Sequence, residues 1–305
     1  MTTFPKFKPL TVDDRDEIQE RLWAYQPDTS ELGFSNLYIW RTYYNFEWAI
    51  HDEWLLLVAH RPEHTFAFQP IGPAPRREVT CNLLRWLRDE HGEAAPFIPR
   101  ADQRLVDELD KLDESGAADD LTIEPQRDHF DYVYLTEDLI ELSGRKYSAK
   151  RNHINNFQRR YEHEYRPLTE DLVEETLALA EVWCEQRSCE EDISLSHEFA
   201  GIKDTMDNFS AVGLEGGALI IDGKVQAFAL GEQLNQETAV IHVEKANPDY
   251  RGIYPMMTQQ FPEHRWADLR YINREQDLGI PGLRRAKESY YPDHLVKKYR
   301  ITLRE

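Results

Sequence analysis

The chain has 305 residues and a formal net charge of −20, because 36 lysines and arginines stand against 56 aspartates and glutamates. Phosphate backbones and anionic lipids repel so acidic a protein, which excludes a coat for long nucleic acids and a general membrane-surface binder. Hydrophobic residues make up 41% of the chain, enough to bury a core. Single cores usually split near this length, so we expect two domains.

The three cysteines, Cys81, Cys184 and Cys189, are too few and too scattered for a disulfide framework, and none lies in a CxxC pair. This usage is typical of a reducing compartment. The N-terminal residues contain no apolar stretch of signal-peptide length, and no window approaches the ~18 apolar residues of a membrane-spanning helix. We therefore expect a soluble, cytoplasmic protein with no transmembrane segment.

Two segments of the chain begin in the same way. Residues 7–11 read FKPLT and residues 165–169 read YRPLT, and acidic residues follow each copy. In both, a short strand pattern meets a threonine that can cap a helix, with acids in the first turn, where they favour the helix dipole. Similarities of this length also arise by chance, so a duplication depends on the elements that follow each copy.

The first copy is followed by patterns for three short strands, a helix, a strand, an acidic helix and two further strands. These elements span 46–50, 54–60, 65–69, 78–91, 97–98, 102–114, 121–124 and 132–135. The second copy is followed by two helices, three strands, a helix, a strand, a helix and a final strand. They span 171–186, 198–209, 217–221, 224–233, 237–243, 254–263, 269–272, 281–289 and 295–301. Asp222-Gly223, between two of these strands, is a strong signal for a type I′ hairpin.

Both halves therefore run strand, helix, antiparallel meander, helix, strand, helix, strand. This order predicts an α+β fold used twice, each copy a mixed, largely antiparallel sheet flanked by helices, rather than a doubly wound parallel fold. We expect an N-terminal domain over residues 1–142, a basic linker helix over 143–164, and a C-terminal domain over 165–305 that carries the active site.

Charge is segregated around the join between the halves. Residues 143–161 contain six basic residues and no acid, whereas 101–142 contain 14 acids and 3 bases and 168–200 contain 10 acids and 1 base. On a helix, Lys146 and Lys150 share one face, beside Arg151. Two interpretations stay open: a solvated helix that pairs with its acidic neighbours, or a binding site for phosphate.

The segment from Asn273 to Asp277 is the best candidate for chemistry, because it follows a predicted buried strand. Acyl or aminoacyl transfer needs a proton acceptor, a donor for the oxyanion and a partner for a cationic amine. Glu275 or Asp277 can act as base or as ammonium partner, Asn273 as donor, and Arg274 as a phosphate or carboxylate ligand. The structural alternative is that Asp277 caps a turn while Arg274 and Glu275 form surface ion pairs.

Further candidates lie on either side of this segment. Glu244 ends a predicted strand and is a second candidate base, and strict alternation places His242 on the same face. A single histidine on a strand is more often a core residue than a catalyst. Lys287 and Tyr290, on the last predicted helix, either close a binding pocket or only pack against the protein. No cluster of residues has the spacing of a metal site, and none is expected.

The chain resembles a known family over nearly its whole length. The order of elements resembles two GNAT (acyl-CoA N-acyltransferase) folds in tandem, a plan shared by Fem-type aminoacyl-tRNA-dependent peptidyltransferases. More specific strings resemble the phosphatidylglycerol lysyltransferase C-terminal-like family. They are KRNHINNF at 150–157, HVEKA at 242–246, GIYP at 252–255, NREQDLG at 273–279 and GLRRAKESY at 282–290.

The chain departs from the usual coenzyme A site of GNAT enzymes. In that fold a glycine-rich turn opens a helix and binds the pyrophosphate through backbone amides. The matching turn here has Arg251 and a single glycine, Gly252, followed by Pro255, which lacks a backbone donor. Arg251 and Gly252 are still candidates for phosphate binding. The loss of glycines fits Fem-like proteins, whose donor is an aminoacyl-tRNA.

The resemblance implies an acyl- or aminoacyltransferase that moves its group from a phosphate-bearing donor, acyl-CoA or aminoacyl-tRNA, to an amine or hydroxyl of a small molecule or peptide. No other cofactor is expected. A tRNA acceptor end is the one nucleic acid that such a site accommodates, and long nucleic acids are excluded. The alternative is a catalytically degenerate GNAT-like pair that binds a nucleotide, a peptide or an RNA end.

Overall fold

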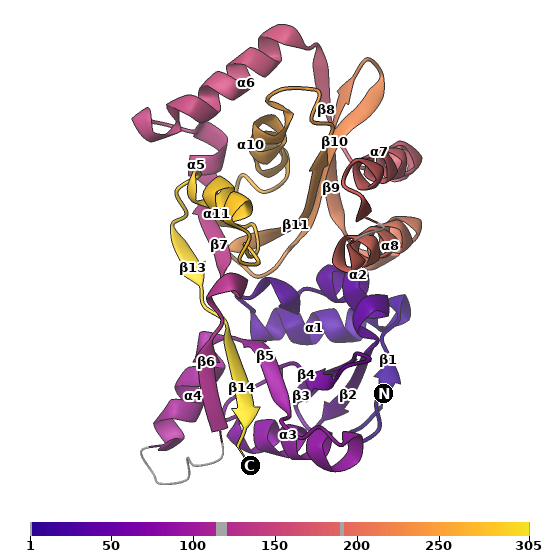
Figure 1. Ribbon diagram of the computed structural model, residues 1–305, viewed down its shortest axis with the longest axis vertical. Helices are drawn as coiled ribbons and strands as arrows, with labels where there is room; N and C mark the ends of the chain where they lie inside the picture. The colour runs from indigo at the N-terminus through magenta and orange to yellow at the C-terminus, as the bar shows by residue number, and fades with distance from the viewer. Residues whose placement is uncertain (1, 114–120, 190–191, 305) are drawn as a thin grey trace. The chain divides into compact units, whose positions relative to one another are not determined.

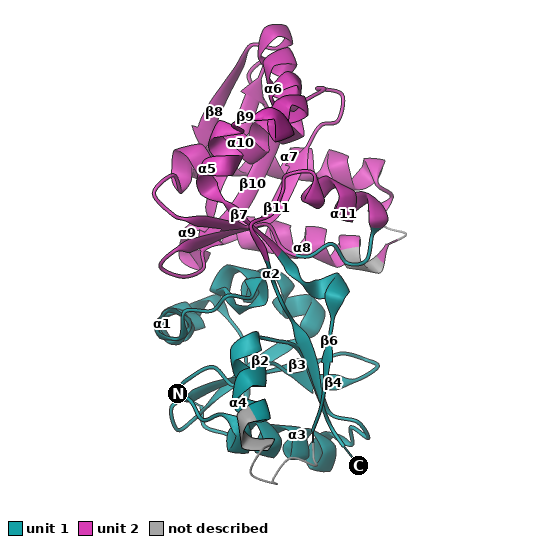
Figure 2. Cartoon of the chain, turned by 90° about the vertical axis from the view of Figure 1, so that its left-hand side faces the viewer, with its two compact units in different colours: residues 1–131, 276–280, 295–305 teal, residues 132–275, 281–294 magenta. Residues whose placement is uncertain are grey.

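The computed structural model describes residues 2–113, 121–189 and 192–304, and Figure 1 shows their elements. The chain divides into two compact units, coloured separately in Figure 2. Unit 1 contains residues 1–131, 276–280 and 295–305, and unit 2 contains residues 132–275 and 281–294. Each unit therefore draws on both halves of the sequence.

The described residues of unit 1 form two small sheets and four α-helices. Its helices are α1 (Arg15–Tyr25), α2 (Phe34–Tyr44), α3 (Arg77–His91) and α4 (Gln103–Asp113). One sheet has the order β1 (Lys8–Pro9), β2 (Phe46–His51), β3 (Trp54–His60), β4 (Thr65–Ala67). The other has the order β5 (Phe97–Ala101), β14 (Tyr299–Leu303), β6 (Leu121–Pro125). Buried Leu83, Leu84 and Leu87 of α3 belong to the same apolar core as Val58 and Ile301.

Unit 2 is built on one larger sheet. Its order is β13 (His294–Val296), β7 (Asp131–Leu135), β12 (Tyr271–Asn273), β11 (Thr238–Ala246), β10 (Lys224–Gln233), β9 (Glu215–Ile221), β8 (His163–Pro167). Its helices are α5 (Thr136–Glu141), α6 (Ser148–Arg160), α7 (Val173–Gln186), α8 (Ile193–Asp207), α9 (Phe209–Val212), α10 (Ile253–Arg265) and α11 (Pro281–Glu288). Helices α7 and α8 cover one face of the sheet and α10 the other (Figure 1).

The duplicated beginnings adopt the same local conformation. Thr11 and Thr169 have nearly identical backbone angles, φ −127° and ψ 169° against φ −130° and ψ 170°, and each precedes a short 3₁₀ turn. The Thr11 hydroxyl donates to the Asp14 carboxylate over 2.9 Å, and the Thr169 hydroxyl donates to Asp171. The predicted α+β class, with largely antiparallel sheets flanked by helices, is confirmed.

Local turn signals were also informative. Asp222 and Gly223 both have positive φ, 52° and 72°, as a type I′ turn requires. They join β9 and β10, which pair antiparallel. The predicted hairpin is therefore confirmed.

The units differ in their bounds from the expected domains. Strand β7, expected to end the first domain, pairs with β12 of unit 2. The final predicted strand, 295–301, is two strands: β13 belongs to the unit 2 sheet, and β14 lies between β5 and β6 in unit 1. Pairing between strands far apart in sequence thus assigns the C-terminal residues to unit 1, whereas the expected second domain contained them all.

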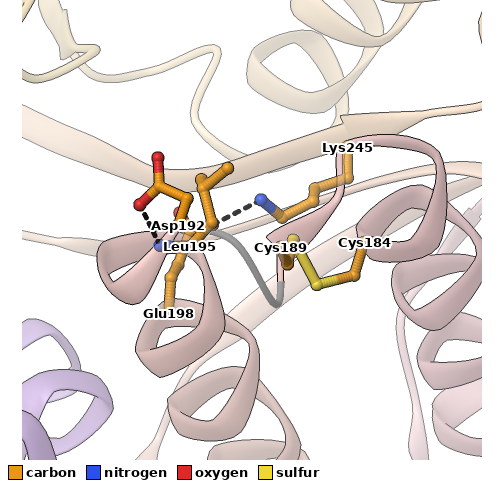
Figure 3. Close-up of a disulfide and its surroundings, with 6 residues drawn as sticks. All are labelled: Cys184, Cys189, Asp192, Leu195, Glu198 and Lys245. Carbon is orange, nitrogen blue, oxygen red and sulfur yellow. Dashed lines mark hydrogen bonds and ion pairs between the residues drawn. A yellow bond between two sulfur atoms is a disulfide. The ribbon is translucent and has the colours of Figure 1, made fainter.

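Two of the three cysteines form a disulfide that their spacing in the sequence did not indicate. Cys184, near the end of α7, forms a disulfide with Cys189, with the two Cα atoms 5.2 Å apart (Figure 3). Cys81 is buried in unit 1 and is not disulfide-bonded. Near the disulfide, Lys245 of β11 donates to Glu198 of α8 over 2.5 Å. Over the described ranges, no helix has both the length and the apolar character needed to cross a membrane.

Candidate functional site

Arg274 lies at the centre of a charged cluster in unit 2. It follows β12, and its Nη2 donates to Glu244 Oε2 over 3.2 Å and to Thr258 Oγ1 over 3.3 Å. Thr258, on α10, donates in turn to Glu244 Oε1 over 3.0 Å. Burial disfavours the Arg274 charge, but Glu244 outweighs this effect and raises the Arg274 pKa. The guanidinium is therefore held in place and charged.

Lys150 brings a second cation to this cluster from α6. Its Nζ donates to Ser289 Oγ over 2.7 Å and lies 3.8 Å from the centre of the Tyr290 ring. The Arg274 guanidinium lies 5.1 Å from the same ring. Burial, with repulsion from Arg274, lowers the pKa of Lys150 to about 8. Both cations therefore lie near the ring of Tyr290. Among the described residues, no carboxylate forms an ion pair with Lys150.

Lys287 completes what we call the Arg274 cluster: Arg274, Lys150, Lys287, Glu244 and Tyr290. Lys287, on α11, donates from Nζ to the backbone oxygen of Arg274. Its own backbone oxygen accepts a hydrogen bond of 2.9 Å from the buried Tyr134 hydroxyl. Three cations and one carboxylate give the cluster a positive charge, and all five members were candidates from the sequence.

A second cluster, the His242 cluster, consists of His242, Glu232 and Glu275. His242 Nδ1 lies 2.8 Å from Glu275 Oε1, and Nε2 lies 3.0 Å from Glu232 Oε1. Burial disfavours a charged imidazole, but the two carboxylates outweigh it and raise the His242 pKa to about 9. At neutral pH the ring is an imidazolium that donates to both carboxylates, and the trio carries a net negative charge.

The strand register explains why His242 has these partners. On β11, Val243 pairs with Leu230 and Ile241 with Gly231, so His242 is an extra residue in a β-bulge. Strict alternation, on which the shared face of His242 and Glu244 rested, is interrupted at this point. The two side chains contact different partners, and His242 lies in a polar cluster instead of an apolar core.

Asn273 and Glu275 form a tight turn after β12. The Glu275 N–H donates to Asn273 Oδ1 over 2.8 Å, and Glu275 has a left-handed φ of 58°. Such a φ is uncommon outside glycine and often marks a functional position. Asn273 is fully buried, whereas the Glu275 side chain is 19% exposed. The turn therefore directs Glu275 toward His242 while Arg274 joins the other cluster.

Asp277 does not belong to the same unit as Glu275. It lies in the 276–280 segment of unit 1, fully buried, where its Oδ1 accepts from the Gly279 N–H over 2.9 Å. Its Oδ2 accepts from Arg127 Nη1 over 3.3 Å. These contacts match the turn-forming alternative from the sequence.

Three other basic candidates lie outside both clusters: Lys146 and Arg151 from the basic join, and Arg251 from the turn before α10. Lys146 forms an ion pair with Asp138 over 3.2 Å. Arg151 donates to the backbone oxygens of Leu142 and Gly144. Arg251 is exposed beside the turn before α10. Among the three basic residues that the sequence singled out in the join, only Lys150 reaches the Arg274 cluster.

Gly252 opens α10 beneath helix α6. It has a left-handed φ of 99°, and a Cβ built there would lie 2.7 Å from the backbone oxygen of His153. The carbonyl of α6 thus approaches the helix end at which GNAT enzymes bind pyrophosphate. A carbonyl oxygen carries partial negative charge, which disfavours an anion at the same point.

Sequence reasoning missed several members of these clusters. Glu232 was read only as part of a strand, yet a glutamate within the apolar run of β10 is a signal of a buried charge pair. Thr258, Ser289 and Tyr134 gave no comparable signal, because their roles depend on which helices pack together. In the part of the chain described, no group of three or more histidines, cysteines or acids is arranged to hold a metal ion.

Comparison with solved structures identifies the class of fold. A conserved protein of unknown function from Bacteroides thetaiotaomicron VPI-5482 is 34% identical, with a TM-score of 0.89, over 98% of this chain and 99% of that one. L-PGS from Bacillus licheniformis is 14% identical with a TM-score of 0.64, over 95% and 92%. FemX is 11% identical with a TM-score of 0.59, over 97% and 96%. The fold is α+β with two GNAT-like domains in tandem, as expected.

The family itself is also shown. A family model described as phosphatidylglycerol lysyltransferase, C-terminal, matches residues 24–302, so the chain belongs to that family. An uncharacterised protein, MYCGA3080 of Mycoplasmoides gallisepticum, is 24% identical over 174 residues, which are 56% of this chain. The match spans 55% of the length of that relative.

Proposed function

We propose that unit 2 transfers an aminoacyl group from a phosphate-bearing donor to an amine or hydroxyl acceptor. Membership of the phosphatidylglycerol lysyltransferase C-terminal family supports group transfer. The observation that carries the proposal is the junction of two oppositely charged clusters at consecutive residues. Arg274 belongs to the positive cluster and Glu275 to the negative one.

The positive cluster suits the phosphate of the donor. Arg274 and Lys150 are close enough for Arg274 to lower the Lys150 pKa. A phosphate between them relieves this repulsion and accepts hydrogen bonds from both groups. Tyr290, whose pKa burial raises to about 12, stays a neutral hydroxyl beside them. The local positive charge supports a tRNA acceptor end as the donor despite the acidic character of the whole chain.

The negative cluster suits the amine of the acceptor. The partly exposed carboxylate of Glu275 can pair with an ammonium, and transfer requires that this ammonium lose a proton. Glu275 and Glu244 are the proton acceptors that we propose. Asn273 is buried and bonded to the Glu275 backbone, so we assign it a positioning role. We do not propose Asp277 as a base, because it forms an ion pair with Arg127 in unit 1.

Aminoacyl-tRNA is favoured over acyl-CoA as the donor. The close approach of His153 O to Gly252 and the proline in the first turn of α10 both weaken an ordinary pyrophosphate site. An aminoacyl-tRNA donor implies a cytoplasmic location. In the cytoplasm, the Cys184–Cys189 disulfide is exposed to reducing conditions.

The alternative function is binding without catalysis. It is favoured by one observation: Glu244 and Glu275 both already accept hydrogen bonds inside the protein. A non-catalytic protein would bind an aminoacyl-tRNA end without releasing or transferring its amino acid.

Binding and transfer are tested with the same substrates. Affinity is measured for aminoacyl-tRNA, uncharged tRNA and acetyl-CoA, and loss of the labelled amino acid from tRNA is followed over time with a panel of amine acceptors. We expect Arg274→Gln to lower aminoacyl-tRNA affinity roughly tenfold or more, since hydrogen bonds to charged groups contribute about 1.5–3 kcal/mol. Arg270→Gln, an exposed arginine four residues earlier, is the matched control.

The outcomes separate the two functions. If Glu275→Gln lowers transfer but not affinity, Glu275 acts in catalysis. Binding with no transfer by the wild type to any acceptor supports the alternative. Tight binding of acetyl-CoA alone, or equal loss of affinity in the Arg274 and Arg270 variants, refutes the proposed donor site.

A further inference from the structure

Unit 1 contains a cavity of about 500 Å³ that the transfer reaction does not use. This volume lies within the range of ordinary small-molecule sites. Aromatic side chains form much of its lining: Tyr44, His64, Phe66 and Phe97. The charged and polar side chains of the lining are Glu93, Arg100, Gln126, His129 and Arg300.

The aromatic lining is a set of packed rings. Phe66 and Phe97 stack with centroids 5.5 Å apart and planes at 20°. His64 lies 5.7 Å from Phe66 and 5.3 Å from Phe97. Tyr44 meets Phe66 edge to face at 5.9 Å. These packed rings give the cavity an aromatic side, against which a ligand with a ring of its own can lie.

A β-bulge brings two arginines to this cavity. On β14 and β5, Tyr299 pairs with Ala101 and Ile301 pairs with Ile98, so Pro99 and Arg100 both lie opposite Arg300. Arg100 has a left-handed φ of 58°. Bulges of this kind redirect side chains and are frequent beside functional sites, and a left-handed arginine is a strained residue that such sites retain.

Arg300 has no acidic partner in the described part of the chain. Its guanidinium carbon lies 3.5 Å from the centre of the Phe97 ring, and its cross-strand neighbour Glu124 makes no ion pair with it. Burial lowers the pKa of Arg300, which remains a cation at neutral pH. A partly buried cation that lies on an aromatic ring and forms no ion pair with the neighbouring Glu124 is a suitable partner for an anion.

The remaining polar groups strengthen this arrangement. Arg100 Nη2 donates to the Tyr44 hydroxyl over 3.4 Å, and its Nε lies 3.6 Å from Glu31. Glu93, the carboxylate of the lining, accepts from the Thr65 N–H. His129 Nδ1 is buried and has no hydrogen-bond partner among the described residues. Burial and Arg100 lower the His129 pKa, which favours the neutral ring.

We propose that this cavity of unit 1 binds a small planar ligand that carries an anionic group, either a carboxylate or a phosphate. The ring of the ligand lies against the aromatic lining of the cavity, and its anionic group pairs with Arg300. This is a second site with its own ligand, and it does not depend on the transfer reaction proposed for unit 2.

The experiment uses the full chain and defined probes. Calorimetric titration with 4-hydroxybenzoate and with AMP tests the two sources of the anion, and 4-hydroxybenzamide and adenosine are their neutral counterparts. We expect at least one anion to bind and its neutral counterpart to bind at least tenfold more weakly. Arg300→Gln should weaken the anion at least tenfold, whereas Arg300→Lys, which keeps the charge, should weaken it less.

Arg304→Gln is the matched control, because Arg304 follows the same strand and donates to Thr122 instead of lining the cavity. It should leave affinity within twofold. The imidazole resonances of His64 and His129 report the location of the ligand by NMR, which also shows that each variant is folded. The proposal is overturned if neither anion binds at millimolar concentration, if the neutral analogues bind equally well, or if Arg300→Gln binds as the wild type does.

Discussion

Each unit holds a cation between two carboxylates, and the two arrangements differ in composition and exposure. In unit 1, Lys298 Nζ lies 2.6 Å from both Glu31 Oε2 and Asp131 Oδ1, and the lysine is 0% exposed. In unit 2, His242 lies between Glu232 and Glu275, and Glu275 is the only member with a substantially exposed side chain.

The difference lies in how the charge is balanced. Around Lys298, burial acts to raise the Glu31 pKa, but Lys298 and Arg100 outweigh it and lower that pKa. Burial, with the nearby Glu31, raises the Asp131 pKa. The Lys298 arrangement is therefore a closed, fully buried anchor for the segment before β14. The His242 arrangement has a cation whose pKa is about 9 and a carboxylate that is partly exposed.

Removing the Lys298 cation should give the largest effect. Lys298→Met leaves Glu31 and Asp131 buried without their cation, and breaking a buried ion pair costs about 3–5 kcal/mol. Chemical denaturation measures the free energy of unfolding, and Lys297→Met, at the exposed neighbouring position, should change it by no more than about 0.5 kcal/mol. Equal effects of the two substitutions would contradict the anchor role.

The His242 cluster should respond to pH instead. The folded-state pKa of His242 is about 9, raised from 6.5, so its contribution to stability is complete below pH 6.5 and is lost as the pH rises to 9. This shift corresponds to about 3 kcal/mol. Unfolding free energies of the wild type and of His242→Gln should therefore converge between pH 6.5 and 9.

Lys298→Met provides the comparison for this titration. This substitution leaves the His242 cluster in place, so the difference in unfolding free energy between wild type and Lys298→Met should not shrink between pH 6.5 and 9. Two outcomes would remove the distinction between the two units. One is a difference in unfolding free energy between wild type and Lys298→Met that shrinks as the pH rises. The other is a difference between wild type and His242→Gln that stays constant.

The disulfide is a third difference between the units, because Cys184–Cys189 lies in unit 2 while Cys81 of unit 1 is not disulfide-bonded. Loop-closure entropy predicts about 2 kcal/mol of stabilisation for so short a loop. Reduction with dithiothreitol should therefore increase amide hydrogen exchange in α7 and β11 and leave α3 unchanged. In Cys184→Ser the reductant should have no further effect, and a reductant effect that persists there would exclude the disulfide as its cause.

Much of the fold was predictable because its signals are local. The hairpin at Asp222-Gly223 and the helix over α3 follow from turn residues and apolar spacing within a short window. The pairing of β14 with β5 and β6 was not predictable in this way, since β14 is separated from both strands by well over a hundred residues. The spacing of Cys184 and Cys189 likewise matched no known motif.

The candidate site shows the same limit at the level of side chains. Glu244, Arg274 and Tyr290 were identified from strand ends and family strings, and the structure brings them together. Glu275 and Asp277, two residues apart, were treated as equivalent, yet they belong to different units. Sequence spacing carries no information on that separation, because it depends on the left-handed turn at Glu275 and on partners from distant strands.

The smallest expected effect concerns Lys150, whose titration should have the opposite sign to that of His242. Its folded-state pKa is lowered from 10.5 to about 8, so the folded protein is penalised below pH 8 and the penalty is relieved as the pH rises to 10.5. Because Lys150 is only half-buried, solvent screening reduces the effect to about 1 kcal/mol. The stability of wild type relative to Lys150→Met should therefore increase over that range.

Lys146→Met is the control, since hydrogen bonding to Asp138 overcomes desolvation and raises the Lys146 pKa, which predicts the reverse trend. If stability depends on pH in the same way in the two variants, Lys150 does not share its site with Arg274. The proposal that the positive cluster binds the phosphate would then be contradicted.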